Sequence, residues 1–416
     1  MRLAKKKASE YCSFCGNPSN KVSFLINGLE AQICDNCAVM AAKIVEDTRR
    51  EENSSKSSSP TEFSFDKKPS DIVAYLNEYI IGQDFAKKVI SVAIYNHYKR
   101  IAKPNNTEDV EIEKSNILLV GNTGTGKTLL AKTVAKLLNV PFAIADATAF
   151  TQSGYVGEDI ESVITRLLQN CNYNIDSAQK GIVFIDEIDK IARKGENPSI
   201  TRDVAGEGVQ QGLLKLLEGS EILVPPQGGR KHPEQPMIKV DTKNILFICG
   251  GAFEGLERII AQRVNKSSVG FKKTKEIESE IQKENLLKQV NALDIKKFGI
   301  IPELLGRLPV VVHLNPLDRK ALQKILLEPK NSLIKQYIAL LKLDGKKLEF
   351  SQEALEFILD RAMEYELGAR GLRSICEAIM TDVMYDSPNS NLEKIVVTKE
   401  MAERNFNQNS GYQEAG

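Results

Sequence analysis

The stretch that decides the fold is Gly121-Asn122-Thr123-Gly124-Thr125-Gly126-Lys127-Thr128, which matches the pattern G-x-x-x-x-G-K-[ST]. An apolar run at 117–120 precedes it and predicts a buried strand, and the run from Leu129 onward predicts the start of a helix. Glycines let the backbone wrap a phosphate closely, successive N–H groups point at the anion, and the new helix offers its positive end. The sequence therefore predicts nucleotide binding.

Two side chains of this stretch carry specific expectations. Lys127 would reach the β- and γ-phosphates of a bound nucleotide, and the Thr128 hydroxyl would be a ligand of Mg²⁺. The alternative is an ordinary glycine turn, which the flanking strand and helix make less favourable.

Composition bounds the class of protein. The chain has 416 residues, 42% of them hydrophobic and 27% charged, which allows two to three domains. A net charge of +1 argues against a broad nucleic-acid surface, and no apolar stretch approaches the length of a membrane span. Seven cysteines, an odd number, fit a reducing compartment. We expect a soluble cytoplasmic protein with no nucleic-acid or membrane partner.

Two C-x-x-C pairs near the start, Cys12/Cys15 and Cys34/Cys37, indicate a tetrahedral zinc site with four thiolate ligands. A unit of this size, 1–48, cannot bury enough apolar surface alone, so zinc would supply much of its folding energy. Four protein ligands leave no open coordination position, which predicts a structural metal. The alternatives are redox-active pairs or disulfides.

The next segments connect this unit to the main domain. A helix is expected at 38–45, followed by a serine-rich polar linker at 49–66 that lacks an apolar period. The turn Tyr79-Ile80-Ile81-Gly82-Gln83 then precedes a helix expected at 84–99. This turn resembles the segment that covers the adenine in AAA+ ATPases, although such turns are common by themselves.

A second strand is expected at 141–147 and a third at 181–187, the latter ending in Asp186 and Glu187. The carboxyl end of a parallel strand faces the crevice into which the phosphate loop also opens. Asp186 would hold Mg²⁺, directly or through water, and Glu187 would orient and deprotonate the attacking water. The alternative is a solvated acidic turn.

Three later loops are candidates for contacts with other chains. Gly154-Tyr155-Val156-Gly157, before a helix expected from residue 158, is either a packed turn or a mobile loop that grips varied chains. Arg230-Lys231-His232 forms a basic tip on an expected hairpin, and basic tips are usually only solvated. Val269-Gly270-Phe271 is an apolar tip in a polar stretch, so a partner's pocket is plausible.

The C-terminal part is expected to be mostly helical. Arg307 precedes a strand expected at 310–314 and would lie on the domain's flank, where an arginine finger acts on a neighbouring subunit. Arg370, at the start of the last long helix, can turn back toward the nucleotide. Helices are expected at 320–327, 333–341, 352–365 and 371–386, and a strand pair at 347–350 and 394–398.

The predicted fold class is α/β. A large ATPase domain at 67–315, with a parallel sheet and a phosphate loop, is followed by a small, mostly helical domain at 316–402. A zinc-binding domain at 1–48 and the linker at 49–66 precede them, and a disordered tail is expected at 403–416.

The combination of these motifs resembles the ClpX family, the AAA+ ATP-dependent unfoldase subunits of the Clp protease, over nearly the whole chain. The resemblance implies a homohexameric ring that uses ATP and Mg²⁺, threads substrate proteins into a ClpP-type peptidase and receives adaptors at its zinc-binding, dimerising domain. Asn122 and Val269 depart from the family's usual Pro and Ile or Leu, and both keep the required character.

The resemblance also implies roles for individual residues. Tyr155 and Val156 would lie in a pore loop that drags the substrate, residues 193–206 would form a second pore loop, and Arg230, Lys231 and His232 would ring the entrance. Val269, Gly270 and Phe271 would dock on the peptidase. Glu187, Arg307 and Arg370 would be catalytic. The nucleotide contacts would be Ile80, Ile81, Gly121, Asn122, Thr123, Gly124, Thr125, Gly126, Lys127, Thr128, Leu129, Asp186 and Arg370.

Three alternatives stay open from the sequence. A nucleic-acid motor or clamp loader shares the ATPase core, but the chain lacks a basic stripe interleaved with aromatic residues. A remodelling chaperone could work without a peptidase. A non-enzymatic nucleotide switch is disfavoured by the acidic pair at 186–187 and the candidate finger Arg307.

Overall fold

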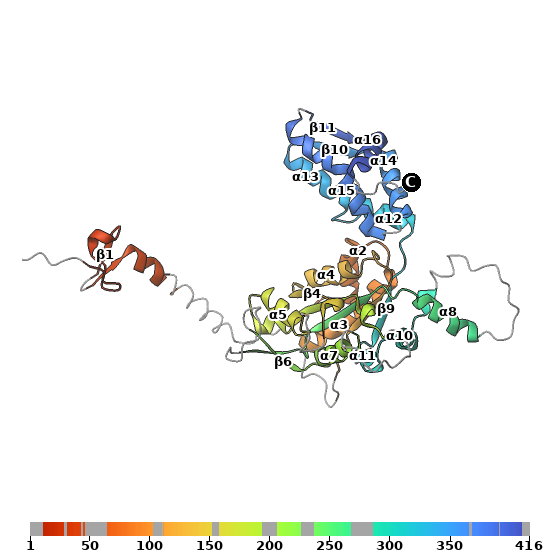
Figure 1. Ribbon diagram of the computed structural model, residues 1–416, viewed down its shortest axis with the longest axis horizontal. Coiled ribbons are helices and arrows are strands. Elements are labelled where there is room, and N and C mark those ends of the chain that lie inside the picture. Colours follow the sequence, from red (N-terminus) through yellow and green to blue (C-terminus); the bar gives the residue numbers. More distant parts are fainter. Residues whose placement is uncertain are drawn as a thin grey trace, which may run out of the picture. The chain divides into compact units, whose positions relative to one another are not determined.

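The computed structural model describes residues 11–28, 31–42, 45, 65–102, 110, 112–151, 158–193, 206–225, 237–267, 286–365, 368–390 and 392–409. The chain divides into two compact units, 1–64 and 65–416 (Figure 1). None of the described helices combines the length and apolar character that a membrane span requires.

The first unit is small and has little apolar core. Its elements are a short 3-10 helix η1 (Ser19–Lys21), an antiparallel pair of strands and helical residues at 35–42, which confirms the helix expected at 38–45 over 38–42. The strands are β1 (Leu25–Asn27) and β2 (Gln32–Cys34). Among its described residues only Cys12 and Cys34 are buried, so a core of apolar side chains does not hold this unit together.

The second unit is built on a five-stranded parallel sheet with the strand order β4-β5-β8-β3-β9. The phosphate loop follows β3, and β8 and β9 pair with this strand on either side. β3 and β8 are buried along their whole length, as expected for parallel strands covered on both faces. The strands are β3 (Ile117–Val120), β4 (Phe142–Asp146), β5 (Ile182–Asp186), β8 (Leu246–Gly251) and β9 (Val310–His313).

Helices surround this sheet (Figure 1). Residues at their N-termini explain where some of them begin. Pro69 occupies the first turn of α2, and Asn291 caps α10 in a reciprocal box with Asp294. The elements are α2 (Pro69–Asn77), α3 (Asp84–Ala102), α4 (Lys127–Leu138), η2 (Ala147–Ala149), α5 (Ser162–Gln169), α6 (Ile175–Ala178), η3 (Ile188–Ile191), α7 (Glu207–Glu218), α8 (Leu256–Ser267), η4 (Leu287–Gln289), α10 (Ala292–Phe298) and α11 (Pro302–Gly306).

A hairpin projects from the sheet domain between α7 and β8. Its strands β6 (Glu221–Val224) and β7 (Ile238–Asp241) pair antiparallel, which confirms the expected hairpin. The helix expected from residue 158 begins later, at Ser162, because Glu158 instead forms an isolated parallel bridge with Phe150.

The C-terminal part has a core of its own. Its short strands β10 (Lys347–Phe350) and β11 (Lys394–Val397) form the expected pair, and the structure shows that they run parallel. The helices follow the sequence predictions closely, with α15 beginning three residues earlier than expected. They are α12 (Arg319–Leu327), α13 (Leu333–Leu343), α14 (Gln352–Glu364), α15 (Gly368–Asp386), η5 (Ser387–Asn389) and α16 (Lys399–Asn409).

Two boundary predictions are wrong. The disordered tail expected from residue 403 is replaced over 403–409 by α16, because Phe406 is buried against Phe357 and the Asn405 side chain donates to the Ile379 carbonyl. The linker expected at 49–66 ends before Phe65, whose ring stacks on Tyr98 at 5.6 Å between centroids.

Candidate functional site

The phosphate loop connects β3 to α4 and has the backbone that its glycines predict. Gly124 and Gly126 adopt φ values of 81° and 98°, a left-handed region that glycine enters without steric cost. Gly126 is the residue before the first helical residue, Lys127, so the positive end of a twelve-residue helix opens onto the loop. This geometry fits the phosphates of a nucleotide.

Lys127 lies inside this loop. It is 8% exposed, and its Nζ donates to the carbonyls of Gly121 at 2.5 Å and Asn122 at 3.0 Å. Burial lowers the pKa of Lys127, and the carboxylates of Asp186 and Asp189 oppose that effect. An anion in the loop would therefore relieve the cost of burying this ammonium group.

The two predicted magnesium ligands meet directly. The Thr128 hydroxyl donates to Asp186 Oδ2 at 2.9 Å, across the edge of the sheet where β5 ends. Glu187 follows with φ 57°, a strained conformation for a residue with a side chain, and its N–H donates to Asp186 Oδ1 at 3.0 Å. The hydroxyl and carboxylate oxygens are the ligand types that Mg²⁺ prefers, so the pair fits this ion.

One carboxylate at this edge was not assigned a role from the sequence. Asp189 is 6% exposed, accepts a hydrogen bond from the Ala252 N–H at 3.0 Å, and raises the pKa of Lys127. Its signal in the sequence was its place three residues after Asp186, one turn of helix later. Through this hydrogen bond, Asp189 connects the acidic end of β5 to Ala252, the residue after β8.

The start of α15 lies against the phosphate loop. A Cβ built on Gly368 would lie 3.3 Å from the Thr123 carbonyl oxygen and 3.4 Å from the Gly124 Cα. The nearby charge of Arg370, an exposed side chain, contributes to lowering the pKa of Lys127. The structure thus brings the C-terminal helical part and Arg370 to the nucleotide loop of the same chain.

Arg307 is placed elsewhere, at the C-terminal end of α11. Its Nε donates to Glu218 Oε1 at 3.3 Å, and its side chain is 46% exposed. Its backbone carbonyl accepts from the Asn116 amide at 2.9 Å. Arg307 thus occupies an exposed position at the end of α11, and its role as an arginine finger stays a prediction.

Hydrogen bonds from a buried lysine fix the segment that is predicted to cover the adenine. Ile80 is 6% exposed, and its carbonyl accepts from the buried Lys87 Nζ at 2.6 Å. The same ammonium donates to Asn77 Oδ1 at 2.7 Å, and burial lowers the pKa of Lys87. Leu129, in the first turn of α4, is 48% exposed. Ile80 is therefore held in place, whereas Leu129 is open to contact.

The four cysteines of the first unit form one cluster. Their Sγ atoms all lie within 4.8 Å of one another, and Cys15 and Cys34 are 3.7 Å apart. A tetrahedron with metal–sulfur bonds of about 2.3 Å has edges of about 3.8 Å, so the cluster fits zinc.

The thiols show why a cation belongs at this cluster. Hydrogen bonds with Cys15 and Cys34 raise the pKa of Cys37 to about 12. Burial opposes the ionisation of Cys12, but hydrogen bonds from the backbone N–H groups of Cys15 and Cys34 outweigh this effect. They lower the pKa of Cys12 to about 6. Four thiolates at this separation require a compensating positive charge.

Three groups of predicted site residues lie outside the described residues. They are Tyr155 and Val156, then Arg230, Lys231 and His232, and finally Val269, Gly270 and Phe271. Residues 194–205 of the predicted second pore loop lie outside the described residues as well, and all these roles stay predictions. The described elements place the second group within the hairpin between β6 and β7, and the third shortly after α8.

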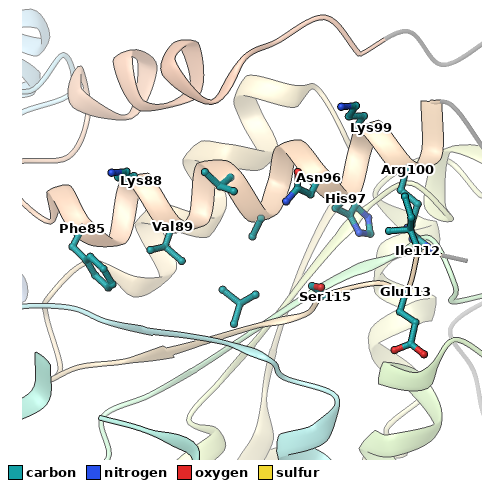
Figure 2. A pocket seen from close by; sticks show the side chains of 13 residues that line it. Phe85, Lys88, Val89, Asn96, His97, Lys99, Arg100, Ile112, Glu113 and Ser115 are labelled. Atoms are coloured by element: carbon teal, nitrogen blue, oxygen red, sulfur yellow. The ribbon is translucent and has the colours of Figure 1, made fainter. Parts of the chain in front are cut away.

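A groove of about 850 Å³ lies away from the phosphate loop, along α3 (Figure 2). Figure 2 shows its side chains along the helix, from Phe85 at one end to Arg100 at the other, with Ile112 and Ser115 facing them. None of the phosphate-loop residues contributes to it.

Comparisons with known proteins agree with this geometry. Three family models match: "ClpX C4-type zinc finger" over 10–47, "AAA domain (Cdc48 subfamily)" over 112–311, and "C-terminal, D2-small domain, of ClpB protein" over 317–398. The chain is similar to two curated proteins named "ATP-dependent Clp protease ATP-binding subunit ClpX". The one from Bacteroides thetaiotaomicron is 57% identical over 97% of both chains. The one from Porphyromonas gingivalis is 55% identical over 97% of this chain and 98% of that protein.

Proposed function

The chain belongs to the ClpX family of AAA+ ATPases, and from this premise we propose that it unfolds substrate proteins and threads them into a ClpP-type peptidase in the cytoplasm. The observation that carries the proposal is the meeting of Lys127, Thr128 and Asp186 at one edge of the sheet, with Glu187 next in the chain.

The chemistry follows from that edge. ATP would bind with its phosphates in the loop at 121–128, and Lys127 would turn from its carbonyl partners to the β- and γ-phosphates. Thr128 and Asp186 would hold Mg²⁺, which neutralises charge on the phosphates when bound. Glu187 would orient the water and accept its proton.

Two arginines would complete the site from different places. Arg370 would approach the phosphates from α15, whose first residue lies close to the phosphate loop. Arg307, paired with Glu218 on an exposed surface, would reach the nucleotide of the next subunit in a homohexamer. Loss of the γ-phosphate then removes contacts from both, and this differential interaction would drive movement of the C-terminal part, the proposed small domain at 316–402.

The same proposal assigns the loops. Tyr155 and Val156 would grip the substrate in the ring's pore, Arg230, Lys231 and His232 would surround its entrance, and residues 269–271 would dock on the peptidase. Support comes from family membership, because these residues lie outside the described part of the chain.

The zinc unit would be a docking and dimerising module for adaptors and substrates. Its support is that large apolar side chains of this unit are exposed: Phe14 is 72% exposed, Val39 71% and Met40 66%. Zinc bound by the four cysteines would hold this surface in place.

The test combines the purified chain, ClpP-type peptidase, Mg²⁺-ATP and a tagged folded protein. We expect degradation that depends on ATP and peptidase together. Deleting residues 269–271 should abolish degradation and leave ATP hydrolysis unchanged, and retained degradation would contradict the docking role. Unfolding without any stimulation of degradation would favour the alternative, a chaperone that works without a peptidase.

A further inference from the structure

The side chain of Gln83 makes an unusual pair of contacts. Its Nε2 donates to the Asn315 carbonyl at 2.7 Å, and its Oε1 accepts from the Asn315 N–H at 2.8 Å. One side-chain amide thus satisfies both backbone groups of a residue 232 positions away in sequence. Gln83 is 6% exposed and has φ 58°, a left-handed backbone conformation that is uncommon for a residue with a side chain. This conformation directs the amide toward Asn315.

Asn315 lies at the junction of the two parts of the ATPase unit. β9 ends at His313, and α12, the first helix of the C-terminal part, begins at Arg319. The preceding residue, Leu314, donates its N–H to the Val120 carbonyl at 2.8 Å. A Cβ on Gly121, the first phosphate-loop residue, would lie 2.9 Å from the Leu314 Cβ. The exit chain, which we define as residues 314–318 between β9 and α12, is therefore bonded to the end of β3 and lies next to Gly121.

The other end of the same turn contacts the C-terminal part itself. The Glu78 carbonyl accepts from the Lys330 N–H at 2.8 Å, and the Glu78 carboxylate pairs with the Lys330 Nζ at 2.6 Å. Lys330 lies between α12 and α13. Residues 78–83 thus bond to the exit chain at one end and to the helical part at the other, and Ile80 and Ile81 lie between these bonds.

We propose that Gln83 is a positioning residue that transmits the nucleotide state from the turn at 78–83 to the exit chain at Asn315, so that hydrolysis moves the C-terminal part. This inference rests on the proposed function. ATP bound against Ile80 and Ile81 would change the position or the mobility of the turn at 78–83. The paired hydrogen bonds of Gln83 would transmit that change to Asn315. Without them the turn loses its direct bonds to Asn315, and hydrolysis is poorly converted into movement.

The experiment measures ATP hydrolysis and unfolding of a tagged folded protein in parallel, in the full chain. Gln83→Met removes both hydrogen bonds at similar volume, and Gln83→Glu removes only the donor. Gln336→Met is the matched control, since the Gln336 side chain makes one exposed hydrogen bond, to the Asn331 carbonyl, and none to Asn315 or to residues 78–83 within the described part of the chain. The melting temperature of each variant reports whether it folds.

We expect Gln83→Met still to bind and hydrolyse ATP, while substrate unfolded per ATP falls about 3- to 30-fold. Gln83→Glu should show a smaller loss, and Gln336→Met none. A folded Gln83→Met with normal unfolding per ATP would overturn the inference. If Gln83→Met does not fold, Gln83→Glu decides by the same criterion. If neither folds, Gln83 is a structural residue and the inference is likewise wrong. A wild-type chain that hydrolyses no ATP would instead contradict the proposed function.

Discussion

The two units of this chain are stabilised internally by different interactions. In the first, the described residues that are fully buried are two of the four clustered cysteines, while Phe14 and Val39 face solvent. In the second, strands such as β3 and β8 are buried at every position, and apolar side chains form extended cores. A unit whose fold comes from a metal can use its apolar side chains for partners, whereas the larger unit uses them for its own stability.

The polar groups differ in the same way. The larger unit places two of its buried charges, Lys127 and Asp189, beside the phosphate loop, where a nucleotide would compensate the charge of Lys127. The smaller unit places its ionisable groups, the cysteines, around one point. Each unit therefore has one site whose ligand is also part of its stability.

The largest expected effect concerns the zinc unit. Chelation, or the change Cys34→Ser, should unfold it, because metal binding in such units contributes about 10–16 kcal/mol and the unit's described residues bury no side chain besides Cys12 and Cys34. Proteolysis at residues 11–42 and zinc release measure the loss. Cys171→Ser, which alters a partly exposed cysteine outside the cluster, is the control. Resistance of the chelated unit to proteolysis would contradict the comparison.

The next effect should fall on the larger unit alone. Glu187→Gln keeps the shape of the side chain but cannot accept a proton, so ATP hydrolysis should fall about 10²- to 10⁴-fold with ATP binding retained. Its zinc content should equal that of the wild type. Undiminished hydrolysis would remove Glu187 from the proposed mechanism.

A pair of phenylalanines tests the two cores directly. Phe184→Ala, in β5, should destabilise the larger unit by about 3–5 kcal/mol, since Phe184 is fully buried and a Cβ on Gly250 would lie 2.8 Å from its ring. Phe14→Ala should change stability by less than about 0.5 kcal/mol, because its side chain is exposed. Denaturant unfolding measures both, and equal effects would contradict the distinction between the units.

A smaller effect is a pH dependence of the larger unit. Burial, with Arg100 and Lys114 nearby, lowers the pKa of His97 to about 3. The unfolded chain therefore binds more protons than the folded chain between pH 3 and about 6.5, so stability falls as pH decreases through this window, by at most about 1.4 kcal/mol per pH unit. His97→Gln should flatten this slope in thermal unfolding at several pH values. An unchanged slope would exclude His97 as its source.

The features predicted from sequence are those that local patterns determine. The phosphate loop, the acidic strand end and the cysteine pairs each combine a few residues at fixed spacing, and the structure brings each group together. The contact of Gln83 with Asn315 could not be predicted, because it joins positions 232 residues apart. α16 was missed because its sequence is polar, and only packing against α14 and α15 shows that Ala402 and Phe406 are buried.

The central claim is that ATP hydrolysis at this site drives unfolding of another protein. Its most direct test follows the fluorescence of a tagged, stably folded protein mixed with the purified chain and Mg²⁺-ATP, beside the Glu187→Gln variant. The account predicts that fluorescence is lost with the wild type, in proportion to ATP consumed, and is kept with the variant. Loss of fluorescence without ATP hydrolysis, or none despite hydrolysis, would contradict it.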